Sequence, residues 1–131
     1  MSEFKVLLVD DETDFVETLV KRLRKRKLDV RAASSGQQAL ELLAESPSDI
    51  VVLDVKMPDM DGIETLRRIK KIDPCVEVVM LTGHANVEVA MQGMELGAFD
   101  YLMKPIDIDD LLYKLQDAFK KKRCEAGIGN K

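Results

Sequence analysis

Five short apolar segments alternate with five amphipathic segments along this chain of 131 residues, and no other feature constrains the fold as strongly. The apolar segments span residues 5–9, 29–33, 50–53, 76–81 and 99–103, and each has the length of a strand. After each of them, apolar residues recur at helical spacing, as Phe15, Leu19 and Leu23 do. The pattern predicts a strand followed by a helix, five times over.

Residues typical of helix starts and ends support the same division into strands and helices. Ser35, Asp61 and Asp107 with Asp110 stand where helix starts are expected, and Pro74 and Gly97 stand at helix exits. Repeated strand–helix units predict an α/β fold with a mostly parallel sheet and helices on both faces. The length suits one domain. We assign residues 1–122 to this domain and residues 123–131 to a flexible tail or the start of a linker.

Composition excludes several classes of protein. The net charge of −4 gives no overall bias toward nucleic acid or anionic membrane. The apolar runs fall short of the roughly 18 residues of a membrane span, and the first residues lack the pattern of a signal peptide. Cys75 and Cys124 form no disulfide framework or metal-ligand spacing. The basic run at residues 21–27 (KRLRKRK) is interpreted as a solvated helix end, since cations suit a helix C-terminus. A cytoplasmic location is expected.

Polar and charged residues follow four of the five predicted strands. They are Asp10 and Asp11, Asp54, Thr82 and Gly83, and Lys104 with Pro105. Right-handed crossovers place the carboxyl ends of parallel strands at one edge of the sheet, where ligands bind. If the strand order is 2-1-3-4-5, the acidic pair and Thr82 flank Asp54. Lys104 then begins roughly 10 Å from Asp54, at about 4.8 Å per strand.

These residue types fit phosphoryl chemistry on a carboxylate. Three neighbouring carboxylates resist ionisation unless a cation joins them, and oxygen ligands with room for water suit Mg²⁺. A lysine and a hydroxyl facing the same point suit a phosphoryl group, and Asp54 could act as the nucleophile. Taken alone, adjacent aspartates after a strand are more often a turn or a helix cap. Their predicted position opposite Asp54 and Lys104 favours a site.

Four stretches of sequence also carry a family resemblance. Asp10-Asp11, the segment VVLDVKMPDMDG at residues 51–62, LTGH at 81–84 and YLMKP at 101–105 occur in the order seen in receiver domains. The chain resembles the receiver domain of bacterial response regulators over about residues 4–120. The resemblance implies a flavodoxin-like, doubly wound (βα)5 three-layer sandwich with a five-stranded parallel sheet of order 2-1-3-4-5. It also implies a signalling phosphoacceptor in a two-component system rather than a turnover enzyme.

The resemblance implies a role for each site residue. Asp54 would accept a phosphoryl group from a histidine kinase or phosphotransfer protein. Mg²⁺, or Mn²⁺ in its place, would be bound by Asp11, Asp54 and the backbone carbonyl of Lys56, with Asp10 acting mainly through a metal-bound water. Thr82, Lys104 and the amides of Lys56 and Gly83 would hold the phosphoryl oxygens. Thr82 and Tyr101 would form the switch, Lys56 and His84 would tune hydrolysis, and the Lys104–Pro105 bond would be cis.

The same resemblance locates the partner surfaces. Kinase specificity is expected on the first helix around Phe15–Leu19. The face of the fourth helix, fifth strand and fifth helix would be remodelled for a partner, an output domain or a second copy of the chain. We expect no contact of this domain with nucleic acid or membrane. The kinase, the output and the oligomeric state stay open.

Two other classes of protein share parts of this pattern. A haloacid-dehalogenase-like phosphatase also uses Asp, Thr and Lys at sheet edges, but it needs Asp-x-Asp after the first strand, where this chain has Glu12 in the third place. That alternative gives Asp54 no role. A flavodoxin-like FMN protein needs Ser, Thr and Gly in its first loop, whereas the acidic loop at residues 10–14 (DDETD) would repel phosphate.

Overall fold

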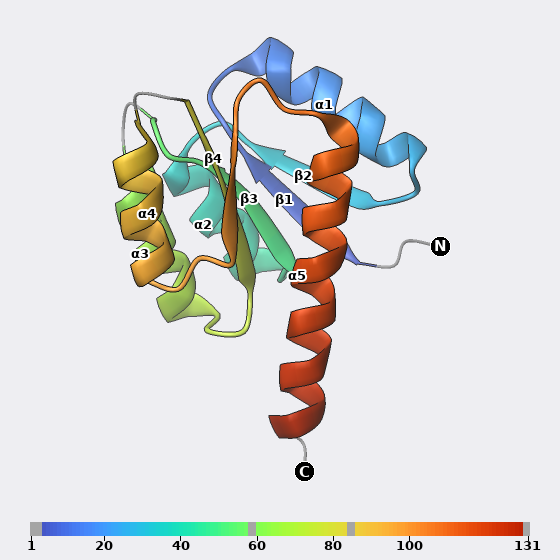
Figure 1. The fold of residues 1–131 in the computed structure, drawn as a ribbon, viewed down its shortest axis with the longest axis vertical. Coiled ribbons are helices and arrows are strands. Elements are labelled where there is room, and N and C mark those ends of the chain that lie inside the picture. Colours follow the sequence, from blue (N-terminus) through green and yellow to red (C-terminus); the bar gives the residue numbers. More distant parts are fainter. Residues whose placement is uncertain (1–3, 58–59, 84–85, 130–131) are drawn as a thin grey trace.

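The computed structural model describes residues 4–57, 60–83 and 86–129, with side chains described through residue 122. Five strands and five helices alternate along the chain, as predicted (Figure 1). The strands are β1 (Lys5–Val9), β2 (Asp29–Ala33), β3 (Ile50–Asp54), β4 (Glu77–Thr82) and β5 (Asp100–Met103). The helices are α1 (Thr13–Lys25), α2 (Gly36–Glu45), α3 (Gly62–Ile72), α4 (Val87–Glu95) and α5 (Ile108–Gly129).

The strands form one parallel sheet in the order β2-β1-β3-β4-β5, which confirms the predicted topology. Helices cover both faces, in three layers (Figure 1). Leu7, Val51 and Met80 pack on the side of α2, α3 and α4, whereas Leu8, Val52 and Leu81 pack on the side of α1 and α5. Because both faces are buried, the central strands read as continuous apolar runs.

Three predicted helix starts are confirmed by their hydrogen bonds. The Ser35 hydroxyl accepts from the Gln38 amide at 3.1 Å, and the Asp61 carboxylate accepts from the Glu64 amide at 2.8 Å. The Asp107 carboxylate accepts from the amides of residues 109 and 110. Each side chain satisfies an amide that has no partner within the helix.

The start of α3 packs directly onto the end of β3. The Gly62 amide donates to the Val55 carbonyl at 3.1 Å, and a Cβ at Gly62 would lie 2.5 Å from Val55 Cα and 2.8 Å from the Asp54 carbonyl oxygen. Only glycine permits this approach. The backbone that carries Asp54 is therefore fixed from both sides, by β3 before it and by α3 after it.

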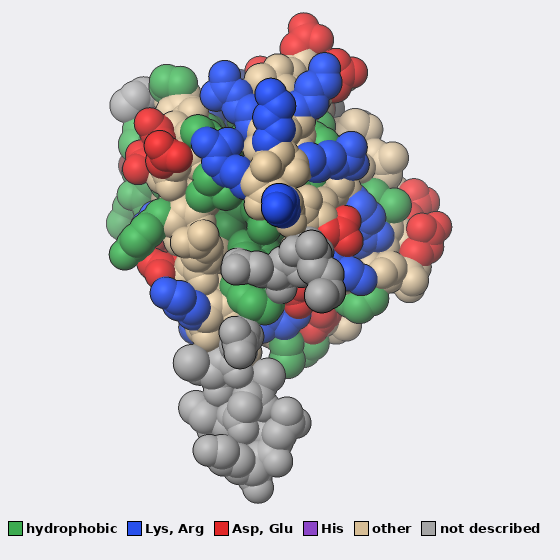
Figure 2. Space-filling view, turned by 90° about the vertical axis from the view of Figure 1, so that its right-hand side faces the viewer, with side chains coloured by type: hydrophobic (Ala, Val, Ile, Leu, Met, Phe, Trp, Pro, Cys, Tyr) green, Lys and Arg blue, Asp and Glu red, His purple; other side chains and the backbone are tan. Residues whose placement is uncertain are grey.

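Two surface features bear on the sequence expectations. The basic residues of positions 21–27 are exposed, and Lys and Arg side chains gather on the face at the right of Figure 1, where α1 ends (Figure 2).

Helix α5 continues to Gly129, past residue 122 where the sequence places the domain boundary, so that boundary stays a prediction. In the described part of the chain, no helix combines the length and the apolar character needed to cross a bilayer.

Candidate functional site

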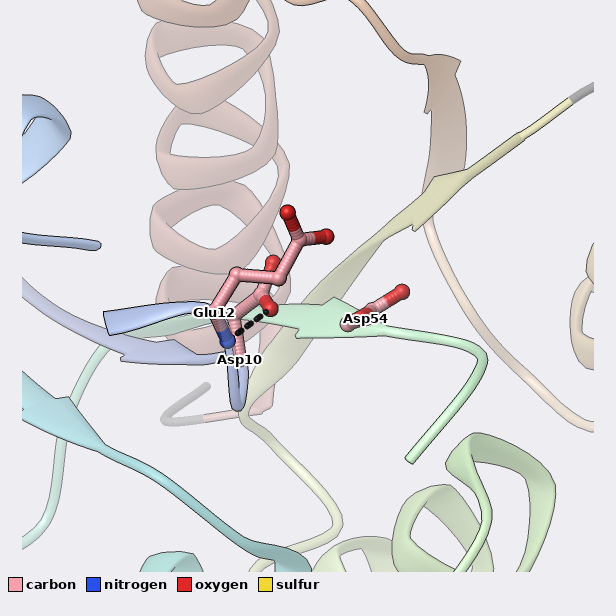
Figure 3. A group of neighbouring side chains, drawn as sticks. All are labelled: Asp10, Glu12 and Asp54. Atoms are coloured by element: carbon pink, nitrogen blue, oxygen red, sulfur yellow. Dashed lines mark hydrogen bonds between the residues drawn. The ribbon is translucent and has the colours of Figure 1, made fainter. Parts of the chain in front are cut away.

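Three carboxylates from two neighbouring strands meet at the carboxyl edge of the sheet. Asp10 and Glu12 follow β1, Asp54 ends β3, and one carboxylate oxygen of each lies within 4.8 Å of the others (Figure 3). Asp10 is 1% exposed and Asp54 is 6% exposed, whereas Glu12 reaches in from the surface. The Glu12 amide donates to Asp10 Oδ1 at 2.9 Å. Asp10 therefore forms the turn expected of an aspartate after a strand, and its carboxylate also belongs to the cluster.

Lys104 extends from the end of β5 into this acidic cluster. Its backbone amide donates to the Thr82 carbonyl at 2.8 Å, and the following bond to Pro105 is cis, as the family resemblance implied. Its Nζ lies 2.9 Å from Asp10 Oδ2, 3.0 Å from Glu12 Oε1 and 3.7 Å from Asp54 Oδ2. One ammonium group thus faces three carboxylates.

The environment of Asp54 disfavours its charged form. Burial and the nearby Asp10 carboxylate raise the pKa of Asp54 from 3.8 to about 6, although Lys104 and the Lys56 amide, which lies 3.3 Å from Asp54 Oδ1, lower it in part. Low dielectric and a like charge both penalise ionisation, so Asp54 keeps its proton to a higher pH than an exposed aspartate does. At pH 7 most of the Asp54 carboxyl is therefore still ionised, at a cost in free energy.

The opposite balance holds at Lys104. Burial alone would lower the pKa of Lys104, but hydrogen bonds to Asp10 and Glu12 and the charge of Asp54 outweigh burial and raise it. The lysine therefore carries its positive charge throughout the physiological range.

An open cavity of about 490 Å³ lies beside the carboxylates. It is lined by Asp11, Glu12, Asp54, Lys56, Met57, Gly83, Asn86 and Lys104. Asp11 and Lys56 are exposed, and a Cβ at Gly83 would meet nothing within 4 Å. The cavity has room for a small anion next to the Asp54 side chain.

The two residues expected to act as a switch, Thr82 and Tyr101, lie on the neighbouring strands β4 and β5. Thr82 is fully buried, and its hydroxyl donates to the Gly83 carbonyl at 3.0 Å. Tyr101 on β5 is half-buried, pairs with Met80 of β4 and packs against the core on the side of α2, α3 and α4. In this structure the Thr82 hydroxyl is engaged with backbone next to the site.

Some site residues were predicted from the sequence and others were missed. The structure brings Asp10, Asp54 and Lys104 into contact and places Asp11, Lys56 and Gly83 on the cavity wall. His84 lies outside the described residues. Glu12, Met57 and Asn86 also line the cavity and were not predicted from the sequence. Glu12 could have been found, because it extends the acidic pair to the N-cap position of a helix that begins at the same sheet edge.

The oxygen atoms of the cluster fit a hard divalent cation. Carboxylate oxygens, with space for water beside them, are the ligands that Mg²⁺ uses in proteins. A cation would also remove the repulsion between Asp10 and Asp54 that raises the pKa of Asp54. The oxygen ligands of the described residues therefore fit the Mg²⁺ ion that the sequence predicts.

The topology and its acidic edge together define a receiver-type signalling domain, and comparisons with known proteins agree. Residues 6–116 match the family described as the response regulator receiver domain. The chain is 42% identical over 113 residues to the transcriptional regulatory protein ZraR of Escherichia coli (strain K12), covering 86% of this chain and 26% of ZraR. It is 36% identical over 121 residues to sporulation initiation phosphotransferase F of Bacillus subtilis (strain 168), covering 92% of this chain and 94% of that protein.

Solved structures agree with these sequences. A response regulator receiver domain protein from Clostridium thermocellum has a TM-score of 0.89 and 35% identity, covering 95% of this chain and 98% of the other. NtrX from Brucella abortus has a TM-score of 0.92 and 29% identity, covering 99% of this chain and 29% of the other. The chain belongs to the response regulator receiver domain family, whose members are signalling phosphoacceptors of two-component systems.

The phosphatase alternative is not supported, because the family matched is the receiver and because Asp54 lies in one cluster with Asp10 rather than apart from it. The chain spans about a quarter of the length of ZraR.

Proposed function

We propose that Asp54 is the phosphoacceptor of this receiver domain. The observation that carries the proposal is the placement of its buried carboxylate: it lies 3.7 Å from the Lys104 ammonium, in an acidic cluster, on the wall of an open cavity. Of the carboxylates in the cluster, Asp54 combines burial with a place on the cavity wall, whereas Asp10 is buried behind it and Glu12 is exposed.

The donor would be a phosphohistidine of a sensor kinase or a phosphotransfer protein. One Asp54 carboxylate oxygen forms the new P–O bond while the P–N bond breaks, and the departing imidazole nitrogen keeps the electron pair of that bond. The reaction needs the ionised carboxylate, so it slows as the pH falls below about 6. Hydrolysis reverses the change: water attacks phosphorus, inorganic phosphate leaves and the Asp54 carboxylate is restored.

The residues around Asp54 neutralise and orient the phosphoryl group. Lys104 offers an ammonium group, and the amides of Lys56 and Gly83 offer backbone donors to its oxygens. Asp11, Asp54 and the Lys56 carbonyl would hold Mg²⁺ or Mn²⁺, with Asp10 acting through water; when bound, the cation supplies positive charge to the carboxylates and the phosphoryl oxygens. Lys56 and His84 would tune the lifetime of the phosphoryl group, as the family resemblance implies.

A conformational change would follow phosphorylation. The Thr82 hydroxyl would leave the Gly83 carbonyl for a phosphoryl oxygen, and Tyr101 would rotate into the space beside it. The face of α4, β5 and α5 would change in consequence. Met91 and Met94 on α4 and Tyr113 on α5 are exposed there, which suits contact with an output domain or a second copy of the chain.

The kinase or phosphotransfer protein would dock beside α1. A second groove of about 560 Å³ is lined by Phe15, Thr18, Leu19, Arg22, Lys104, Pro105, Ile106 and Ile108. This groove is mainly apolar and adjoins the site through Lys104, so a helix seated in it could bring a phosphohistidine to Asp54. The position agrees with the kinase specificity expected at Phe15–Leu19.

Incubation with acetyl phosphate tests the proposal without any partner protein. We expect one labile phosphate per chain by intact mass in the presence of Mg²⁺, and none after chelation or in Asp54→Asn. Asp29→Asn, which removes an exposed carboxylate at the start of β2, should behave as the parent. Steady hydrolysis of phosphate esters without a phosphorylated protein would overturn the proposal.

A further inference from the structure

The aromatic ring of Phe15 lies against the ammonium group of Lys104. Phe15 is a half-buried residue of α1, and Lys104 Nζ lies 4.7 Å from the centre of its ring. At this distance the negative face of the ring attracts the cation, and more strongly where water is excluded. Lys104 is itself only 21% exposed. The contact thus joins α1 to the end of β5 at the side chain that faces Asp54.

Lys104 forms part of the wall of both cavities. It lines the acidic cavity beside Asp54, and it lines the apolar groove together with Phe15. Carboxylates hold its ammonium group on the first side, and the Phe15 ring lies against it on the second. The position of this one side chain therefore depends on contacts from both sides.

The Phe15 ring also affects how many N–H donors of Lys104 remain available for hydrogen bonds. An ammonium group has three N–H donors, and Asp10 and Glu12 accept hydrogen bonds from it at 2.9 Å and 3.0 Å. Asp54 Oδ2, at 3.7 Å, is beyond hydrogen-bonding distance. An aromatic face stabilises the charge without being a strong hydrogen-bond acceptor. Phe15 therefore holds the cation in place while leaving one donor for an oxygen at Asp54.

We infer that Phe15 is a positioning residue for phosphoryl transfer, and that it holds Lys104 where the ammonium group can bind a phosphoryl oxygen on Asp54. The inference rests on the proposed role of Asp54 as phosphoacceptor. It differs from a docking role for Phe15, because it predicts an effect of Phe15 on the reaction when no partner protein is present.

Replacement of the ring by an aliphatic side chain tests the inference. In Phe15→Leu and Phe15→Met, the rate of phosphate uptake from acetyl phosphate with Mg²⁺ should fall on the order of tenfold, as expected for a lost cation–π contact at a partly buried site. Phe15→Tyr keeps a ring and should restore the rate to within about twofold of the parent. Two aliphatic variants are used so that poor folding of one leaves the other to decide.

A matched pair elsewhere in the molecule provides the control. Phe99 is a half-buried aromatic residue with Lys121 Nζ 5.7 Å from its ring centre, and it lines neither cavity. Phe99→Leu should therefore keep the parental rate. In addition, the Lys104 methylene protons of the parent should show an upfield ring-current shift by NMR, absent in Phe15→Leu and present in Phe15→Tyr.

The outcomes separate this inference from the proposed function. Phosphate uptake by the parent together with parental rates in the folded aliphatic variants would overturn the role of Phe15 and leave Asp54 as the acceptor. A rate in Phe15→Tyr as slow as in Phe15→Leu would overturn it too. Failure of the parent itself to take up phosphate would overturn the role of Asp54, and the role of Phe15 with it.

Discussion

Lys104 Nζ donates a hydrogen bond of 2.9 Å to Asp10 Oδ2, although the two residues are 94 positions apart in the sequence. The contact exists because β1, β3, β4 and β5 are successive strands of one parallel sheet, so their carboxyl ends share an edge. Asp10 is almost fully buried and needs a cation nearby. The same lysine therefore stabilises the fold and, in the proposed function, serves the phosphoryl group.

We predict that Lys104→Met lowers the free energy of unfolding by about 2 kcal/mol at pH 7, between the values typical of exposed and buried ion pairs. The variant leaves three carboxylates without their ammonium partner. Urea titration would measure the loss. Lys114→Met is the control, since it removes an ion pair with Asp100 nearer the surface and should cost less than about 1 kcal/mol. Equal losses in the two variants would contradict the prediction.

Asp54 should make the stability of the metal-free protein fall as the pH rises. Its pKa is raised from 3.8 to about 6, so the folded state binds the proton more tightly than the unfolded state does. The loss of stability caused by ionising Asp54 in the folded state is absent below pH 3.8. It grows between pH 3.8 and 6 and is complete above pH 6. Relative to the parent, Asp54→Asn should therefore gain stability over this window, by at most ~3 kcal/mol.

Urea titrations of both proteins from pH 4 to pH 8, with chelator present, would measure that difference. Asp29→Asn, at an exposed position, should follow the parent at every pH. A constant difference between Asp54→Asn and the parent across the whole range would contradict the assigned cause.

Mg²⁺ should stabilise the parent and do so more at pH 7.5 than at pH 5. The cation competes with the proton for the Asp54 carboxylate, and binding to the folded state alone adds about 2.7 kcal/mol at a hundredfold excess over Kd. Thermal unfolding with and without Mg²⁺ would measure the gain. It should shrink in Asp54→Asn and in Asp11→Asn. Comparison with Glu12→Gln would show whether this third carboxylate of the cluster contributes to binding.

The structure predicts opposite outcomes for alanine at two glycines beside the site. A Cβ at Gly62 would lie 2.5 Å from Val55 Cα, so Gly62→Ala must displace the backbone next to Asp54 and should cost about 1–3 kcal/mol. A Cβ at Gly83 meets no atom within 4 Å, so Gly83→Ala should change stability by less than about 1 kcal/mol. Urea titration of the two variants distinguishes these cases, and comparable losses would count against the described packing of α3 on β3.

The strand pattern was predictable because both faces of this sheet are buried. Apolar runs mark β1, β3 and β4, and the observed bounds differ from the predicted ones by at most one residue, with Asp54 and Thr82 added as the last residues of β3 and β4. From the residues alone, 2-1-3-4-5 was one possible strand order. The family resemblance then implied this order. Periodicity gives the elements, but the choice among parallel orders depends on packing between segments far apart in the chain.

The candidate site was predictable in part. Asp10, Asp54 and Lys104 could be placed together because each follows a strand. The direction of the Glu12 side chain depends on how α1 leaves the sheet, and the contact between Phe15 and Lys104 depends on how α1 packs beside β5. Neither relationship is encoded in local sequence. The roughly 10 Å expected between the start of Lys104 and Asp54 is spanned by the lysine side chain itself.

The most direct test of the account is to identify the residue that carries the phosphate. After reaction with acetyl phosphate and Mg²⁺, borohydride reduction of the acyl phosphate followed by peptide mapping would mark the modified carboxyl group. We predict that the mark lies on Asp54 alone. A mark on Asp10 or Asp11, with Asp54 unmodified, would contradict the assignment of the buried strand-end carboxylate as the phosphoacceptor.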